Sequence, residues 1–567
     1  MKNNKLFAIL LILAMSFTLV ACGLSDAQYE TEITEENRVE LLDKLGIKLY
    51  EEKLVKGEIP EKQEVSEEEP MLFSYELPSI DNYVPDVKGG GEVNVEIFLP
   101  LENNGSSIRE LVKYVAESFN DSKLKNSNGQ TMSVTIRSLD SSLAEDFIQY
   151  GAYMPNGYIA ANELYGLLMQ ANGINVKKLS SRLVGNTMGI AIEKKAYEEL
   201  RQIYDDVSIY TIVKANLEGN LSIGYTNPTN NPTGLNFVVS MLAYFDENNP
   251  YSFEATTDFS EFQNTVSSVS YSTEQMLRAV ENGQINAFVI EHQAYEINDT
   301  ITSEFVFLPF GVRHDYPLYE MEYTTAEEEE VLIEFSKYFQ SEKVQGYADG
   351  FYFNRDDAYI STVSAEKYPA SMITEILKFW KEEKSSGKQI VAIFVSDISG
   401  SMSGRKIEAL KESLKNSMQY VSENAKVGMI SYADNVYYNL PIGEFTEEQQ
   451  AYFAGAVDSL KANGGTATNN ALLMAIKLIN EEEQKSSKEI KPIIILLSDG
   501  ATCSGYSLRS VEKLIGAFDI PIYTIAYGND ANVSELTKIS NINGGAFINS
   551  STDDVGYAIK TLFNAEI

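Results

Sequence analysis

The sequence predicts an α/β fold with more than one domain. At 567 residues, the chain is longer than one hydrophobic core usually serves. From residue 92 onward, short apolar runs alternate with segments whose apolar residues recur at helical spacing. One such run, Val391–Val395, ends at a Ser- and Gly-rich loop and is followed directly by a helical pattern at Ile407, Leu410 and Leu414. This alternation favours parallel sheets with helices on both faces.

The first residues have the pattern of a targeting segment. Lys2 and Lys5 flank the start of an apolar stretch, Leu6–Val20, that is short for a membrane span. The stretch leads into Leu19-Val20-Ala21-Cys22-Gly23, which resembles the lipobox of bacterial lipoproteins. The resemblance implies a signal peptide over residues 1–21, acylation of Cys22, and a lipid anchor on the extracytoplasmic face of the cell membrane. An ordinary signal peptide with a chance cysteine is the alternative.

Residues 22–91 are expected to form a flexible acidic tether. Glutamates are dense, as in Glu67-Glu68-Glu69, and prolines interrupt the segment at positions 60, 70, 78 and 85. A short helix around Arg38–Glu52 fits the pattern, and the rest is expected to space the globular part from the membrane.

Residues 92–355 have the element order of an α/β module. Alternating apolar residues at 93–99 predict the first strand, and Ser106-Ser107 begins a helical pattern. Further strands are expected at 133–137, 158–161, 188–192, 285–290 and 306–309, and helices at 106–119, from 235, at 274–281 and at 328–339. Within residues 92–200, this alternation predicts a mostly parallel sheet.

Four stretches of this module resemble the bacterial extracellular solute-binding proteins. They are Asn186–Ile192, the NPTNNPTG loop at 227–234, Asn282–Ala287 and Gln345–Phe353. The resemblance implies a two-lobed, periplasmic-binding-protein-like module with a two-stranded hinge and a small solute in the cleft between the lobes. The lobes could instead have lost solute binding and serve as an adaptor.

Eight polar residues are candidates for lining that cleft by the same analogy. Two of them, Ser106 and Ser107, begin a helix, where free N–H groups favour an anion. Helix capping and loop chemistry without a ligand is the alternative for each residue, and the ligand class stays open. The candidates are Asn103, Asn104, Ser106, Ser107, Ser141, Asn162, Thr233 and Glu291.

Residues 356–388 are expected to be a helical connector in which Trp380 is a packing anchor. From residue 389 to residue 567, strands and helices alternate again in a doubly wound, Rossmann-like order. The expected elements are strands 391–395, 426–432, 435–440, 492–498, 520–526 and 545–548, and helices 404–423, 447–459, 468–483, 507–517, 532–540 and 553–564.

Oxygen-bearing side chains cluster where these strands end. Asp397, Ser399 and Ser401 follow the 391–395 run, Thr466 follows two glycines before a helix, and Asp499 follows the 492–498 strand. Ligands bind at the carboxyl ends of strands in open α/β sheets. Carboxylate and hydroxyl oxygens are hard donors that suit Mg²⁺ rather than zinc.

This pattern resembles the metal-ion-dependent adhesion site of a von Willebrand factor A (VWA) domain. The resemblance covers about residues 389–567 and implies that Asp397, Ser399, Ser401, Thr466 and Asp499 hold Mg²⁺, with Mn²⁺ or Ca²⁺ as alternatives. It further implies a protein partner that offers an Asp or Glu to the metal. A Ser/Gly loop without metal is the alternative.

Composition excludes several function classes. The formal charge of −37 argues against nucleic acid, since phosphate contacts need clustered Lys and Arg. The chain has two histidines and no hydrolase, zinc-protease or P-loop motif, so we expect no enzyme. Apart from Cys22, the one cysteine is Cys503, which is either a reactive thiol near Asp499 or a small buried side chain.

The sequence thus predicts a membrane-anchored extracellular protein that binds a partner through its VWA domain. A solute receptor that serves a transport system is the first alternative, and a metal-assisted hydrolase is the second.

Overall fold

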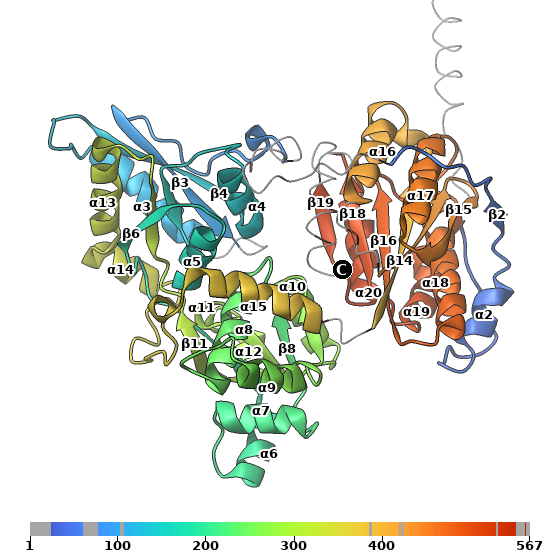
Figure 1. Ribbon diagram of the computed structural model, residues 1–567, viewed down its shortest axis with the longest axis horizontal. Helices are drawn as coiled ribbons and strands as arrows, with labels where there is room; N and C mark the ends of the chain where they lie inside the picture. Colours follow the sequence, from blue (N-terminus) through green and yellow to red (C-terminus); the bar gives the residue numbers. More distant parts are fainter. Residues whose placement is uncertain are drawn as a thin grey trace, which may run out of the picture. The chain divides into compact units, whose positions relative to one another are not determined.

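The computed structural model describes residues 24–59, 77–101, 107–384, 388–418, 421, 424–528, 531–550, 559 and 562. The chain forms two compact units, one from residues 1–60 and 389–555 and one from residues 61–388 and 556–567 (Figure 1). The predicted signal peptide, Cys22 and most of the predicted final helix lie outside the described residues. No described helix is long and apolar enough to cross a membrane.

The second unit begins with a five-stranded sheet that forms its first lobe. Its strand β3 pairs in parallel with β4 and β5, whereas β12 runs antiparallel to both of its neighbours. Val95, Ile97 and Leu99 pack under one helical layer, and Phe98 faces the other. The sheet order is β4 (Met132–Asp140), β3 (Val93–Leu101), β5 (Gly157–Ile159), β12 (Leu318–Met321) and β6 (Val176–Ser180). The helices are α3 (Ser107–Ser122), α4 (Ser141–Gln149), α5 (Glu163–Ala171), α13 (Ala326–Phe339) and α14 (Glu342–Asp349).

A second five-stranded sheet forms the second lobe of this unit. The strand predicted at 188–192 belongs here and runs antiparallel, so the prediction of one mostly parallel sheet over residues 92–200 is wrong on this point. The order is β11 (Phe305–Arg313), β7 (Thr187–Glu193), β10 (Ala287–Glu291), β8 (Ile223–Thr226) and β9 (Ser268–Ser270). The helices are α6 (Lys194–Tyr204), α7 (Ile209–Leu217), α8 (Pro232–Phe245), α9 (Phe253–Gln263), α10 (Thr273–Glu281), α11 (His292–Glu296) and α12 (Asp299–Glu304).

The chain crosses between the two sheets twice, after β6 and again after β11. The two crossing segments lie side by side: Leu183 N donates to Asp315 O at 3.0 Å, and His314 N donates to Asn186 O at 3.2 Å. This is the two-lobed architecture with a paired link that the resemblance to solute-binding proteins implies.

Helix α15 (Ala370–Glu383) packs against both lobes, as Figure 1 shows in gold. Ile373, Ile376 and Trp380 are buried in the same apolar cluster as Leu168 of the first lobe and Tyr225 of the second. The helix expected in the connector therefore belongs to the core of this unit.

The other unit is a seven-stranded sheet with helices on both faces. Strand β13 is buried along nearly its whole length, because it lies between β14 and β16, with which it pairs in parallel, and because helices cover both faces of the sheet. The sheet order is β19 (Phe547–Ser550), β18 (Ile522–Tyr527), β16 (Ile490–Ser498), β13 (Gln389–Asp397), β14 (Lys426–Tyr432), β15 (Val436–Glu444) and β2 (Leu49–Glu51). The helices are α16 (Arg405–Ser417), α17 (Glu447–Ser459), α18 (Thr468–Lys485), α19 (Leu508–Gly516) and α20 (Val533–Ile542). The predicted doubly wound order is confirmed, with element ends mostly within two or three residues.

The structure differs from the predicted flexible tether over residues 22–91. Strand β1 (Leu24–Ser25) pairs with β17 (Gly505–Tyr506), and β2 extends the large sheet beyond β15. Leu41 and Leu42 of α2 (Arg38–Lys44) are 5% exposed within the core of this unit. The acidic composition suggested a solvated chain, but these few apolar side chains are enough to hold residues 24–49 on the domain. Residues 60–76 of the predicted tether lie outside the described residues.

Candidate functional site

The predicted metal residues come from loops at one edge of the large sheet. Asp397 is the last residue of β13, and Asp499 follows the last residue of β16. The two strands are parallel neighbours, with Ser396 opposite Leu497, so both carboxylates leave the sheet at the same edge.

Backbone hydrogen bonds tie the loop after β13 to the loop before α18. Gly400 N donates to Gly464 O at 3.0 Å, and Asn463 N donates to Ile398 O at 2.8 Å. Gly464 has φ +83°, a conformation that glycine adopts without strain. Cys503 N in turn donates to Thr466 O at 2.9 Å, which joins the loop after β16 to the same turn.

The five predicted side chains lie together. Ser399 Oγ and Ser401 Oγ are 2.9 Å apart, and Ser401 Oγ donates to Asp499 Oδ1 at 2.8 Å. Ser401 Oγ and Thr466 Oγ1 both lie 3.8 Å from where a Cβ on Gly500 would stand, so Thr466 faces the same space. Asp397 Oδ1 accepts from Ser399 N at 2.8 Å.

Burial dominates the electrostatics of Asp397. Burial raises the pKa of Asp397 to about 6, against the opposing effect of hydrogen bonds from Ser498 and Ser399. Ser498 Oγ donates to Asp397 Oδ2 at 2.6 Å, a contact not anticipated from the sequence. A buried carboxylate that lacks a neighbouring cation favours the binding of one.

Lys406 is a second residue that the sequence analysis missed. Its Nζ lies 2.5 Å from Asp499 Oδ2, in an ion pair where the Asp499 side chain is 1% exposed. The five predicted metal ligands offer two carboxylates and three hydroxyls, so all of the donor atoms are oxygen. Within the described ranges, no three His, Cys, Asp or Glu side chains gather as a metal site, so the hydroxyls are essential to any cation site here. This chemistry fits Mg²⁺.

The predicted cleft residues of the two-lobed unit do not form one cluster. Asn103, Asn104 and Ser106 lie outside the described residues. Ser107 Oγ accepts from Gln293 Nε2 at 2.6 Å, while Ser141 Oγ is buried with no hydrogen-bond partner in the described part of the chain. Thr233 is buried in the first turn of α8.

Asn162 and Glu291 are brought together by His314, which the sequence analysis did not select. His314 is 0% exposed, and its Nε2 lies 3.0 Å from Asn162 Nδ2 while its Nδ1 lies 2.7 Å from Glu291 Oε1. Asn186 and Tyr316 also donate to Glu291 Oε2, at 2.7 and 3.0 Å. Burial acts to raise the pKa of Glu291, but the charge and hydrogen bonds of its neighbours, His314 foremost, hold it below its ordinary value. This network connects the two lobes at the crossing segments.

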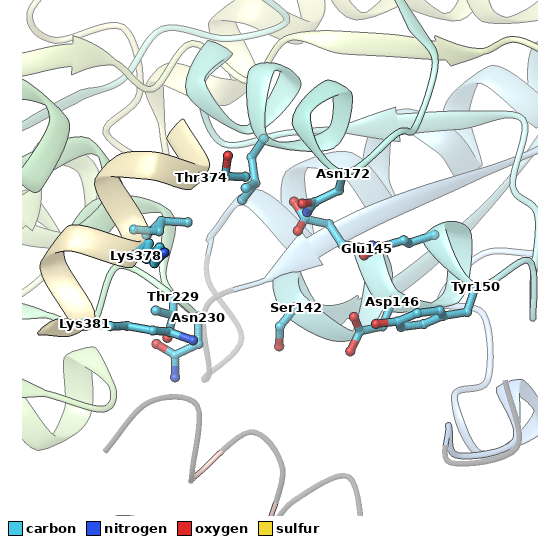
Figure 2. Close-up of a pocket in the computed structure, with 13 residues that line it drawn as sticks. Ser142, Glu145, Asp146, Tyr150, Asn172, Thr229, Asn230, Thr374, Lys378 and Lys381 are labelled. Carbon is cyan, nitrogen blue, oxygen red and sulfur yellow. The ribbon is translucent and has the colours of Figure 1, made fainter. Parts of the chain in front are cut away.

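A cavity of about 470 Å³ lies in the two-lobed unit (Figure 2). Its walls come from α4, the C-terminal end of α5, the loop between β8 and α8, and α15. None of the eight predicted cleft residues lines it, although Ser142 is next to the predicted Ser141. One sequence signal could have located this cavity: the polar residues Ser142, Glu145, Asp146 and Gln149 of α4 recur at helical spacing and so share one face of the helix. The lining residues are Ser142, Glu145, Asp146, Gln149, Tyr150, Leu168, Asn172, Thr229, Asn230, Thr374, Leu377, Lys378 and Lys381.

Comparison with known proteins finds two families, one for each unit. A family model described as "von Willebrand factor type A domain" matches residues 392–564, and one described as "Bacterial extracellular solute-binding protein" matches residues 104–351. Inter alpha-trypsin inhibitor, heavy chain 4, of Mus musculus is 31% identical over 163 residues, which are 27% of this chain and 17% of that protein. The chain thus spans less than a fifth of that relative's length.

Solved structures resemble each unit separately. A von Willebrand factor type A structure from Catenulispora acidiphila is 20% identical, covers 31% of this chain and 42% of its own, and has a TM-score of 0.29. An extracellular solute-binding protein from Bordetella parapertussis is 13% identical, covers 52% and 99% of the two chains, and has a TM-score of 0.36. The fold and the two family matches together identify a chain that joins an N-terminal solute-binding-protein-like module to a C-terminal VWA domain.

Proposed function

We propose that this protein is a lipid-anchored extracellular binding protein whose VWA domain binds a protein partner through a divalent cation. Asp397, Ser399, Ser401, Thr466 and Asp499 would hold Mg²⁺, with Mn²⁺ or Ca²⁺ as alternatives. The observation that carries the proposal is the convergence of these five oxygen-bearing side chains on three loops tied by backbone hydrogen bonds. The role is binding rather than catalysis.

The donor set supports a metal that still needs a ligand. Mg²⁺ prefers six oxygens in near-octahedral geometry. Two carboxylates and three hydroxyls leave at least one position to water or to a partner, and Asp397 and Asp499 together bring a charge of only −2. A carboxylate from a partner's Asp or Glu is the group that such a cation attracts most strongly. The loop hydrogen bonds hold the ligands in place before the partner arrives, which lowers the cost of ordering them on binding.

The position of the N-terminal segment supports a partner at the same membrane surface. Leu24 pairs with Gly505, on the loop that also carries Asp499. Tyr506 N donates to Asn470 Oδ1 at 2.9 Å, at the start of the helix that follows Thr466. An acyl chain on Cys22, two residues before Leu24, would therefore hold the metal edge of the domain close to the membrane.

Thermal unfolding of the mature chain with Mg²⁺, Mn²⁺ or EDTA tests the proposal. A cation that binds only the folded state raises the unfolding midpoint of the VWA unit. We expect this rise in the wild type and in the exposed-carboxylate control Glu512→Gln, and its loss in Asp397→Ala. No rise at millimolar metal in the wild type would contradict the metal site.

Solute capture by the two-lobed module is a second candidate function. The cavity between α4 and α15 favours it, because its volume suits a small solute. This function predicts small-molecule binding that Asp397→Ala leaves unchanged.

A further inference from the structure

The cavity of the two-lobed module has a distribution of charge that points to a class of ligand. The inference that follows rests on the solute-capture function proposed above. Two lysines, Lys378 and Lys381, lie three residues apart on α15 and so share one face of the helix. Two carboxylates, Glu145 and Asp146, come from α4. Figure 2 shows the lysines on one side of the cavity and the carboxylates on the other.

No carboxylate of the described residues forms an ion pair with either of these lysines. Across the described residues, neither Lys378 nor Lys381 takes part in an ion pair within 4.0 Å, although the chain has a formal charge of −37 and many other lysines are paired. Cations placed at the wall of a concave site attract an anionic group more strongly than the same cations on a flat, solvated surface.

On the opposite side of the cavity, the buried carboxyl group of Glu145 gives a second indication of the ligand, which does not depend on the lysines. The residue is 7% exposed, and its Oε1 has no hydrogen-bond partner among the described residues. A buried polar atom without a hydrogen-bond partner destabilises the folded protein, and a ligand that supplies a hydrogen bond to it offsets this cost. Burial, with a further contribution from the neighbouring Asp146, raises the pKa of Glu145 well above its ordinary value. A bound ammonium group would supply both the missing donors and the missing positive charge.

The remaining walls suit a small polar molecule with a short apolar part. Asn172, Thr229 and Asn230 supply amide and hydroxyl groups to the walls, while Leu168 and Leu377 supply apolar surface. A volume of about 470 Å³ suits a ligand of the size of an amino acid or a short peptide.

We propose that this cavity binds a zwitterionic solute, with its ammonium group against Glu145 and Asp146 and its carboxylate against Lys378 and Lys381. A solute with a single charge would contact one charged side of the cavity only, so the site discriminates by the presence of both charges. The proposal also makes α15 part of the binding site. This helix is followed within six residues by β13, the strand that ends at Asp397.

Isothermal titration of the mature chain tests the proposal. The probes are L-glutamine and glycylglycine as zwitterions, with propylamine and propionate as single-charge analogues. We expect at least one zwitterion to bind, and both single-charge probes to bind at least tenfold more weakly. If neither zwitterion binds, or if a single-charge probe binds equally well, the proposal is wrong.

Single substitutions on each charged side of the cavity test whether the zwitterion binds there. Glu145→Gln and Lys378→Met should each weaken the zwitterion at least tenfold, whereas Lys195→Met, an exposed lysine on α6, should leave its affinity unchanged. Unchanged affinity in both cavity variants would overturn the assignment. Because glutamine has nearly the shape of the glutamic acid side chain, we expect Glu145→Gln to fold, and its unfolding midpoint checks this. As a second readout, the zwitterion should slow amide hydrogen exchange in α15 of the wild type.

Two variants distinguish failure of the zwitterion proposal from failure of the metal-site proposal. Asp397→Ala should bind the zwitterion with wild-type affinity, and Glu145→Gln should keep the Mg²⁺-dependent rise in the unfolding midpoint. Loss of zwitterion binding in Asp397→Ala would contradict the assignment to this cavity.

Discussion

The indole N–H of Trp380 donates a hydrogen bond of 2.7 Å to the hydroxyl of Tyr225, and both side chains are 0% exposed. Trp380 lies on α15 and Tyr225 on β8 of the second lobe. The same helix packs Ile373 and Ile376 into the apolar cluster that includes Leu168. The segment between the two family matches is therefore an integral part of the two-lobed module.

Trp380→Phe should destabilise the two-lobed module by about 1–3 kcal/mol, through loss of the hydrogen bond and of part of the buried ring. Calorimetric unfolding of the chain without its predicted signal peptide measures this loss of stability. Tryptophan fluorescence cannot be used, because the substitution removes the only tryptophan. Phe253→Leu is the control, since Phe253 is 87% exposed and should change stability little. Equal effects of the two substitutions would show that α15 is only loosely attached.

Glu291→Gln should lower the stability of the two-lobed module by about 2 kcal/mol at pH 7, because it removes the buried charge that faces His314. The control is Glu247→Gln, which breaks an exposed ion pair with Lys367 and should cost under about 1 kcal/mol.

The same carboxylate predicts a pH dependence. The folded-state pKa of Glu291 is lower than its ordinary value of 4.5, so its ionised form favours folding. That stability is present above the ordinary pKa and is lost as the pH falls through the folded-state pKa. Between pH 5 and pH 3, wild type should therefore lose more stability than Glu291→Gln. Parallel stability curves of the two proteins in urea titrations would contradict this role.

Leu42→Ala should destabilise the VWA unit by about 2–4 kcal/mol, as expected for a buried leucine. Leu42 is 5% exposed, whereas the control Leu54 is 42% exposed and Leu54→Ala should change stability little. Thermal unfolding and limited proteolysis compare the two. If residues 24–59 were a free tether, both variants would unfold like wild type.

Lys406→Met should bind Mg²⁺ about tenfold more tightly than wild type. The reason is that an ammonium 2.5 Å from Asp499 Oδ2 opposes a second cation on the same carboxylate. Lys485→Met, at the far end of α18, is the control and should keep wild-type affinity. Titration of Mg²⁺ followed by the unfolding midpoint gives both affinities. Weaker binding in Lys406→Met would mean that the lysine helps to hold the site together.

The sequence by itself predicted the order of strands and helices and the five residues that meet at the edge of the VWA sheet. The order of the elements follows from local periodicity, and the set of five residues follows from the resemblance to a VWA metal site together with the rule that parallel neighbours end at the same edge. Asp397 and Asp499 leave two neighbouring parallel strands at the same edge, although they lie far apart in the sequence.

Only the tertiary structure decided which distant side chains face one another. The partners of Leu24, the position of His314 between Asn162 and Glu291, and the cavity between Glu145 and Lys378 depend on how elements pack across lobes. Such contacts leave no periodic signal in the sequence. The sequence around a histidine, or of an acidic segment, does not show whether the side chains pack against another element or face solvent. The packing free energy of a few apolar residues, such as Leu41 and Leu42, outweighed the acidic composition around them.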